Sequence, residues 1–179
     1  ANATALLSDS TVGFLEWSGG KDTNLLSETL DPVARVERRN RAALGLTYTT
    51  PSRLAVTAEL EYNGFALDKS QWQQAVASYG IDPLGAYLVQ VQRRQDIASR
   101  RAVLVYLSQR DAFIKNLEVT GLVRYNAEDH SRFAWAEARY HWPRVDVALQ
   151  WQANLGRSNS EYGAVPGKRL VQVLAAFYY

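Results

Sequence analysis

Apolar and polar residues alternate along most of the second half of this chain. From 145 to 156 every second side chain is apolar, and those between them are mostly polar. A period of two is typical of a β-strand with one apolar and one polar face. The same period marks 117 to 126, 133 to 142 and 168 to 179, whereas 101 to 110 is apolar on both faces. The pattern predicts a strand in each of these segments.

The first half of the chain predicts a hairpin and a weaker strand. Residues 41 to 49 and 54 to 63 both alternate and are joined by Thr50, Pro51 and Ser52, a combination that favours an antiparallel hairpin. Residues 11 to 18 predict a further strand, closed by Gly19 and Gly20. The expected total is about eight strands.

Two other segments of the first half carry no strand pattern. Residues 1 to 10 give no firm signal and are expected to be an extended lead-in. Residues 21 to 38 are polar and irregular, with Asp31 and Pro32 as a turn, and are expected to form a long loop.

Residues 64 to 98 interrupt the alternation. Asp68 is placed to cap a helix that runs to Tyr79, with Gly80 as its stop, and Asp82 with Pro83 can begin a second helix that ends near Gln95. A partly helical loop over about 64 to 100 is therefore the favoured interpretation. Since Tyr87, Val89 and Val91 also alternate, a strand at 85 to 92 is the alternative.

Alternation alone does not decide whether the apolar side faces inward, as in a soluble lipocalin-like barrel, or outward toward lipid. Long and short connections alternate along the chain, which for an even strand count places both termini and the short turns at one end. Aromatic side chains also fall near strand ends on the apolar side, as in the interfacial girdles of membrane proteins. They are Trp17, Tyr48, Tyr62, Tyr125, Tyr140, Trp142, Phe177 and Tyr179.

The last strand resembles the C-terminal strand of bacterial outer-membrane β-barrel proteins of the porin-like kind. It ends on Tyr179, with Phe177, Ala175, Val173 and Val171 at alternate positions before it. The resemblance implies an all-β, antiparallel up-and-down transmembrane β-barrel in the outer membrane of a Gram-negative bacterium. It also implies outer-membrane lipid and lipopolysaccharide as surroundings, and recognition of the C-terminal strand by the barrel-assembly machinery. We expect a single domain over 1–179, either a whole barrel or the C-terminal part of a larger one.

The polar sides of the predicted strands carry the candidate functional residues. These side chains either pair across a filled interior or line a water-filled channel and set its selectivity. The lumen-lining candidates are Arg41, Glu59, Glu61, Glu118, Arg124, Glu137, Arg139, His141 and Asp146. In or beside the long helical loop, Arg93, Arg94, Arg100 and Arg101 form a basic cluster that is either solvated or bound to lipopolysaccharide phosphates.

Composition excludes several classes of function. A net charge of +2 argues against a nucleic-acid surface, and with two His and no Cys we expect no metal site and no cofactor. No run of 18 apolar residues is present, so a membrane-spanning helix is not expected. With no Met and no signal peptide, the chain is expected to be a processed form, an expressed fragment or the C-terminal part of a longer protein.

The favoured function is a porin-like channel or export pore for a small or polymeric solute, with an envelope partner or an oligomer as an open possibility. The alternatives are an anchor or adhesin that acts through the long loops, a lipid-modifying enzyme, and a soluble lipocalin-like binding barrel. For an enzyme, Asp129, His130 and Ser131 are adjacent, but neighbours along a chain point apart, and His141 has no nearby Ser. We therefore expect no catalytic site.

Overall fold

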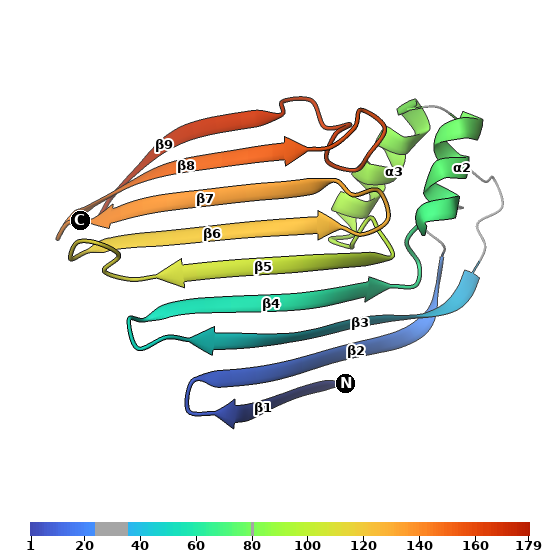
Figure 1. Ribbon diagram of the computed structural model, residues 1–179. Helices are drawn as coiled ribbons and strands as arrows, with labels where there is room; N and C mark the ends of the chain where they lie inside the picture. The colour runs from blue at the N-terminus through green and yellow to red at the C-terminus, as the bar shows by residue number, and fades with distance from the viewer. Residues whose placement is uncertain (24–35, 80) are drawn as a thin grey trace.

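Nine antiparallel strands form one sheet, in which each strand lies beside its neighbours in the sequence (Figure 1). The computed structural model describes residues 1–23, 36–79 and 81–179. The strands are β1 (Asn2–Ser8), β2 (Thr11–Thr23), β3 (Val36–Thr49), β4 (Leu54–Asn63), β5 (Arg101–Gln109), β6 (Leu117–Asn126), β7 (Arg132–His141), β8 (Val145–Leu155) and β9 (Arg169–Phe177). The expected all-β, up-and-down arrangement is confirmed.

The sheet is open. Within the described residues β1 pairs with β2 alone and β9 with β8 alone, and Figure 1 shows these two strands at opposite margins of a curved sheet. Because nine is an odd number and every pair is antiparallel, β1 and β9 run in the same direction. Both edges therefore present unpaired backbone groups.

The sheet has one strand more than the expected count of about eight, because Asn2–Ser8, within the predicted lead-in, form β1. β1 turns into β2 through Asp9 and Ser10. Its apolar residues fall on both faces, with Leu7 on one side and Leu6 on the other, so the sequence shows no clean alternation. The extra strand also corrects the expected position of the N-terminus. The Ala1 amino group donates to the Trp17 carbonyl oxygen at 2.6 Å, away from the short-turn end.

The predicted stop of β2 at Gly19 and Gly20 was also wrong. β2 and β3 stay paired from Thr11 opposite Tyr48 to Thr23 opposite Val36. Two glycines weaken an isolated strand, but here the pairing with β3 continues through them, with Gly19 opposite Asn40 and Gly20 opposite Arg39. Residues 21–23 and 36–38 of the predicted loop are therefore strand, while its Asp31 and Pro32 turn lies outside the described residues.

The connections alternate in length along most of the chain as expected, except that 110–116 is longer than the following connection, 127–131. Residues 9–10, 50–53, 110–116 and 142–144 make the connections at one end of the sheet, which we call the turn end. The described connections at the other end, which we call the loop end, are 64–100, 127–131 and 156–168.

Two helices, α2 (Lys69–Tyr79) and α3 (Ile81–Arg93), lie at the loop end (Figure 1) and confirm the helical interpretation of this segment. The predicted cap is present, since Asp68 Oδ1 accepts a hydrogen bond from the Gln71 backbone N–H at 2.9 Å. The alternative strand at 85 to 92 was wrong. Tyr87 and Val91 are buried and Val89 is exposed, which is the four-residue spacing of a helix.

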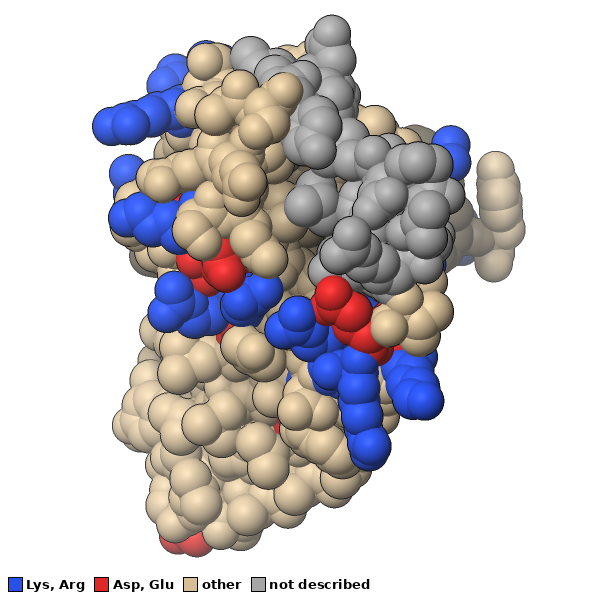
Figure 2. Space-filling view, turned by 90° about the vertical axis from the view of Figure 1, so that its right-hand side faces the viewer, with Lys and Arg blue, Asp and Glu red and all other residues tan. Residues whose placement is uncertain are grey.

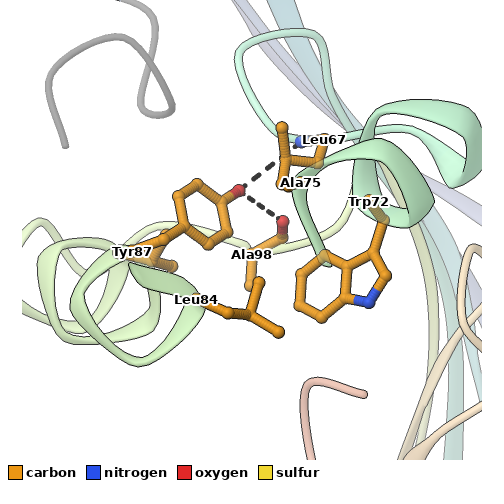
Figure 3. Close-up of a cluster of buried hydrophobic side chains, with 7 residues drawn as sticks. Leu67, Trp72, Ala75, Leu84, Tyr87 and Ala98 are labelled. Atoms are coloured by element: carbon orange, nitrogen blue, oxygen red, sulfur yellow. Dashed lines mark hydrogen bonds between the residues drawn. The ribbon is translucent and has the colours of Figure 1, made fainter. Parts of the chain in front are cut away.

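The helices enclose the hydrophobic cluster of this protein, which Figure 3 shows. Trp72 meets Tyr87 edge to face with ring centroids 6.3 Å apart. The Tyr87 hydroxyl donates to the Ala98 carbonyl oxygen at 2.6 Å, and burial raises the Tyr87 pKa far above its usual range. The cluster consists of Leu67, Trp72, Ala75, Leu84, Tyr87, Val91 and Ala98. Among the described residues, neither helix combines the length and the hydropathy that crossing a membrane requires.

The two faces of the sheet differ sharply in composition. One, which we call the apolar face, carries exposed apolar side chains, such as Leu149 at 52% exposure and Val173 at 69%. On β1 to β9 this face has no Asp or Glu. The other, which we call the polar face, carries most of the charged side chains of the strands, many of them half-buried.

Candidate functional site: the charged polar face

All nine residues predicted to line a lumen lie on the polar face, as the strand registers show. Arg124 on β6 reaches across β5 to Glu61 on β4. Its Nη2 and Nε both donate to Glu61 Oε2, at 2.7 and 3.0 Å. Such a bond requires both side chains to project from the same side of the sheet. The polar residues thus form one continuous surface across the strands.

A first group of charges lies near the loop end on β2 and β3. Arg41 donates to Asp96 Oδ2 at 2.7 Å and to Asp22 Oδ2 at 3.3 Å, and its guanidinium lies over the Phe65 ring, 4.5 Å from the centroid. Asn63 donates to Asp96 Oδ1 at 2.7 Å. This group ties the end of α3 and the following loop to the sheet. Asp22, Asn63 and Asp96 were not predicted, because the sequence places them in different segments.

A second group joins β6 to the 156–168 connection. Asn126 donates to Glu161 Oε2 at 2.7 Å, and the Glu161 backbone N–H donates to Asp129 Oδ2 at 2.6 Å. Burial raises the pKa of the Glu161 carboxyl to about 7, with Asp129 adding to the rise and Arg124 opposing it. Sequence reasoning missed Glu161, which lies in a connection without periodicity.

A third group lies toward the turn end. Arg139 forms a forked pair with Glu137 at 2.8 and 3.1 Å, and Gln150 also donates to Glu137. His141 lies 3.0 Å from Asp146 through Nδ1 and 3.5 Å from Glu118 through Nε2. The charged side chains of this group thus pair with one another. Such pairing offsets the cost of holding charges on a crowded surface.

Some carboxylates of the polar face remain without such partners. A pocket of about 250 Å³ is lined by Glu16, Glu59, Glu61 and Arg41, among others. Within the described ranges, neither Glu16 nor Glu59 forms a side-chain hydrogen bond or ion pair. Of the nine predicted residues, five are acids and three are arginines. The paired residues fit the structural role considered from the sequence, whereas Glu16 and Glu59 lie in this pocket without such a partner in the described residues.

The residues considered for an enzyme are not arranged for catalysis. His130 Nδ1 is 2.5 Å from the Tyr125 hydroxyl, and buried Ser131 accepts a hydrogen bond from the Tyr162 backbone N–H at 3.3 Å. Asp129 bonds backbone N–H groups. His and Ser therefore do not form a nucleophile and base pair. In the part of the chain that the structure describes, no group of three or more His, Asp or Glu is placed to hold a metal ion.

The basic cluster of the loop is largely paired within the molecule. Arg100 bonds Asp68 at 2.9 Å, Arg101 bonds Glu128 at 2.8 Å, and Arg94 lies 3.3 Å from Asp22. Arg93 ends α3. Figure 2, which looks onto the loop end, shows Asp and Glu side chains lying between Lys and Arg side chains. Most of this cluster thus stabilises the loops.

The predicted aromatic residues lie on or next to the apolar face. Trp17 and Tyr62 are in register with Ala42 on β3, on the loop-end side, although Trp17 lies inside β2 and not at its end. Tyr140 and Trp142 stack at the turn end with centroids 4.3 Å apart. The others are Tyr48, Tyr125, Phe177 and Tyr179, the last beyond the end of β9.

In comparisons with known proteins, no family model, no curated protein and no solved structure matches the chain.

Proposed function

We propose that this chain is part of an outer-membrane β-barrel that acts as a porin-like channel or export pore. One observation carries the proposal: the apolar face exposes Leu, Val, Trp and Phe side chains across the whole sheet and carries no acid. Fully burying one such side chain is worth about 1.5–3 kcal/mol, so leaving a sheet of them in water is costly. Hydrocarbon removes this cost, and the turn-end and loop-end aromatics then lie at its two boundaries.

The open edges of the sheet indicate what completes the barrel. A bilayer offers no water to the unpaired backbone groups of β1 and β9, so both edges need partners there. Since β1 and β9 run in the same direction, an odd number of further strands closes the barrel with antiparallel pairing throughout. A second copy rotated about the barrel axis would instead place β9 beside a parallel β1. We therefore favour further strands of the same protein, as in the C-terminal part of a larger barrel.

A larger barrel also gives the polar face a role. Eight strands leave an interior that side chains fill, whereas sixteen or more leave a water-filled channel. In such a channel the carboxylates Glu16, Glu59 and Glu61 would face the aqueous path. With acids outnumbering arginines among the predicted polar-face residues, cations should pass more readily than anions.

Planar-bilayer conductance of the full-length protein tests this function. We expect stepwise single-channel currents with a reversal potential that shows cation preference. The double variant Glu59→Gln/Glu61→Gln should reduce that preference. Asp9→Asn/Asp111→Asn, which removes two exposed carboxylates from the 9–10 and 110–116 turns and none from the polar face, serves as the matched control. A protein that inserts but passes no current would contradict the channel and support the anchor or adhesin role.

The proposal also includes the membrane partners. The exposed C-terminal strand β9, with Phe177 and the following Tyr179, is the segment that we propose the barrel-assembly machinery recognises. Removal of the last three residues should reduce assembly into the outer membrane, measured as the folded fraction in membranes. Normal assembly of the truncated protein would contradict this part.

A further inference from the structure

The apolar face has a row of basic residues along its loop-end margin. The row consists of Lys21, Arg38, Arg101, Arg132 and Arg169, which come from β2, β3, β5, β7 and β9. All five are exposed. Strand registers place them on the apolar face, with Arg101 opposite Tyr62 and Arg132 opposite Tyr125. Lys21 and its partner Arg38 lie beyond Trp17 toward the loop end. This row was not visible in the sequence, because its members are separated by whole strands and loops.

The row places like charges next to one another. Lys21 is directly opposite Arg38 in the β2–β3 ladder, and like charges opposite one another destabilise a sheet. Arg132 is opposite Leu155 and Arg169 is opposite Ala153, so these two arginines flank β8 on the same face.

The neighbouring acids do not compensate this row. Of its five members, Arg101 alone is paired in the described residues, through Glu128. The apolar face itself supplies no carboxylate on the strands. Within the described residues, the other four cations thus have no protein anion, and a bound anion would offset their mutual repulsion.

We propose that this row binds the phosphate groups of lipid A, the phosphorylated glycolipid anchor of lipopolysaccharide, whose acyl chains would cover the apolar face beneath it. The inference rests on the proposed function, because it requires the apolar face to meet lipid. Arg forms forked, charge-assisted hydrogen bonds with phosphate, and four of the five residues are Arg.

Lipid A fits this row better than a simple phospholipid. A phosphomonoester carries about −1.5 to −2 charges at neutral pH, whereas a phosphodiester carries one. Arg132 and Arg169 lie two strands apart, roughly 10 Å, so a head group with phosphates at both ends can engage more than one basic residue. This row shares only Arg101 with the loop cluster of Arg93, Arg94, Arg100 and Arg101, most of which is paired internally.

The test uses the full-length protein and vesicles of three compositions: phosphatidylcholine alone, with one tenth phosphatidylglycerol, or with one tenth lipid A. Co-flotation measures insertion, and mass spectrometry of the detergent-extracted protein measures the lipid that remains bound. We expect insertion into all three and retention of lipid A. Arg132→Gln/Arg169→Gln should lower the apparent affinity for lipid A at least tenfold. Arg110→Gln/Arg144→Gln, which removes two exposed arginines at the turn end, should leave it unchanged.

The outcomes separate the two proposals. Failure to insert into any vesicle overturns the proposed membrane function and this inference with it. Insertion without preferential retention of lipid A, or equal retention by the two double variants, overturns this inference alone. Equal retention of phosphatidylglycerol and lipid A overturns the assignment to the phosphomonoester lipid.

Discussion

The helical loop and the sheet use apolar side chains in opposite ways. In the loop, Trp72 and Tyr87 are 3% and 0% exposed and pack against each other, as in a protein surrounded by water. In the sheet, comparable side chains such as Leu149 and Val173 stand exposed on a face with nothing packed over them in the described structure. Under the proposed function, the loop is built for water and the apolar face of the sheet is built for lipid.

This contrast gives the boundary of the proposed membrane. The helices lie at the loop end and enclose the hydrophobic cluster there (Figure 1). The row of basic residues lies near the same end of the apolar face, and exposed side chains such as Leu149 and Val173 lie between it and the turn end. If the apolar face met water, its apolar side chains would be expected to be buried, as those of the loop are.

The largest expected effect is a loss of stability in the helical loop. Trp72→Ala removes a buried indole whose Nε1 donates to the Asn159 carbonyl oxygen at 3.0 Å. A buried Trp to Ala change costs about 3–5 kcal/mol, and here the loss should be confined to the loop. Hydrogen exchange should show faster exchange over 69 to 93 and unchanged protection in β6 to β8. Val89→Ala, at an exposed position of α3, is the control. Equal loss of protection in the sheet would show that the two regions are not independent.

The second effect concerns the apolar face. Leu149→Arg places a charge in the middle of this face and should cost about 2–4 kcal/mol in a bilayer. Urea unfolding of the vesicle-inserted protein measures it. Phe113→Arg is the matched control, because Phe113 is 93% exposed but lies in the 110–116 turn, where a surface change is worth within about ±0.5 kcal/mol. If both substitutions were equally harmless, the apolar face would be facing water.

The smallest effect depends on pH and concerns the 156–168 connection. The folded-state pKa of Glu161 is raised to about 7 from an ordinary 4.5. The stability that protonated Glu161 contributes is therefore fully present below about pH 4.5 and is lost as the pH rises through 7. Docking of this connection should weaken between pH 5 and pH 8, as hydrogen exchange over 156 to 168 would show. Glu161→Gln should remove most of this dependence and stabilise the connection at pH 8 by about 1–3 kcal/mol, the usual cost of an uncompensated buried group.

Glu118→Gln, with its half-exposed carboxylate on the polar face, is the control for that experiment and should keep the pH dependence of the parent protein. A pH-independent parent, or an unchanged dependence in Glu161→Gln, would show that the burial of Glu161 does not control docking.

Periodicity predicted the strands that have one clean face, and it failed where tertiary pairing replaced the local signal. β6, β8 and β9 followed directly from alternation, and Asp68 correctly marked the start of α2. β1 was missed because its apolar residues fall on both faces. The extension of β2 past Gly19 was missed because only its pairing with β3 supports it.

The candidate site shows the same division. The sequence predicted which charged residues share the polar face, since this follows from counting by two. It did not predict that Asp96 would join Arg41, or that Glu161 would join Asn126, because these partners lie in connections whose course depends on the complete fold. The basic row on the apolar face was missed for a similar reason, since strand register aligns residues far apart in the chain.

The most direct test of the central claim compares two tryptophans on adjacent strands. Trp151 on β8 lies on the apolar face, opposite Ala136, and Trp135 on β7 lies on the polar face, opposite Gln152. Single-tryptophan variants that keep one or the other would be placed in vesicles whose acyl chains carry bromine, a contact quencher. We predict strong quenching of Trp151 and weak quenching of Trp135. Equal quenching, or stronger quenching of Trp135, would contradict a lipid-facing apolar face.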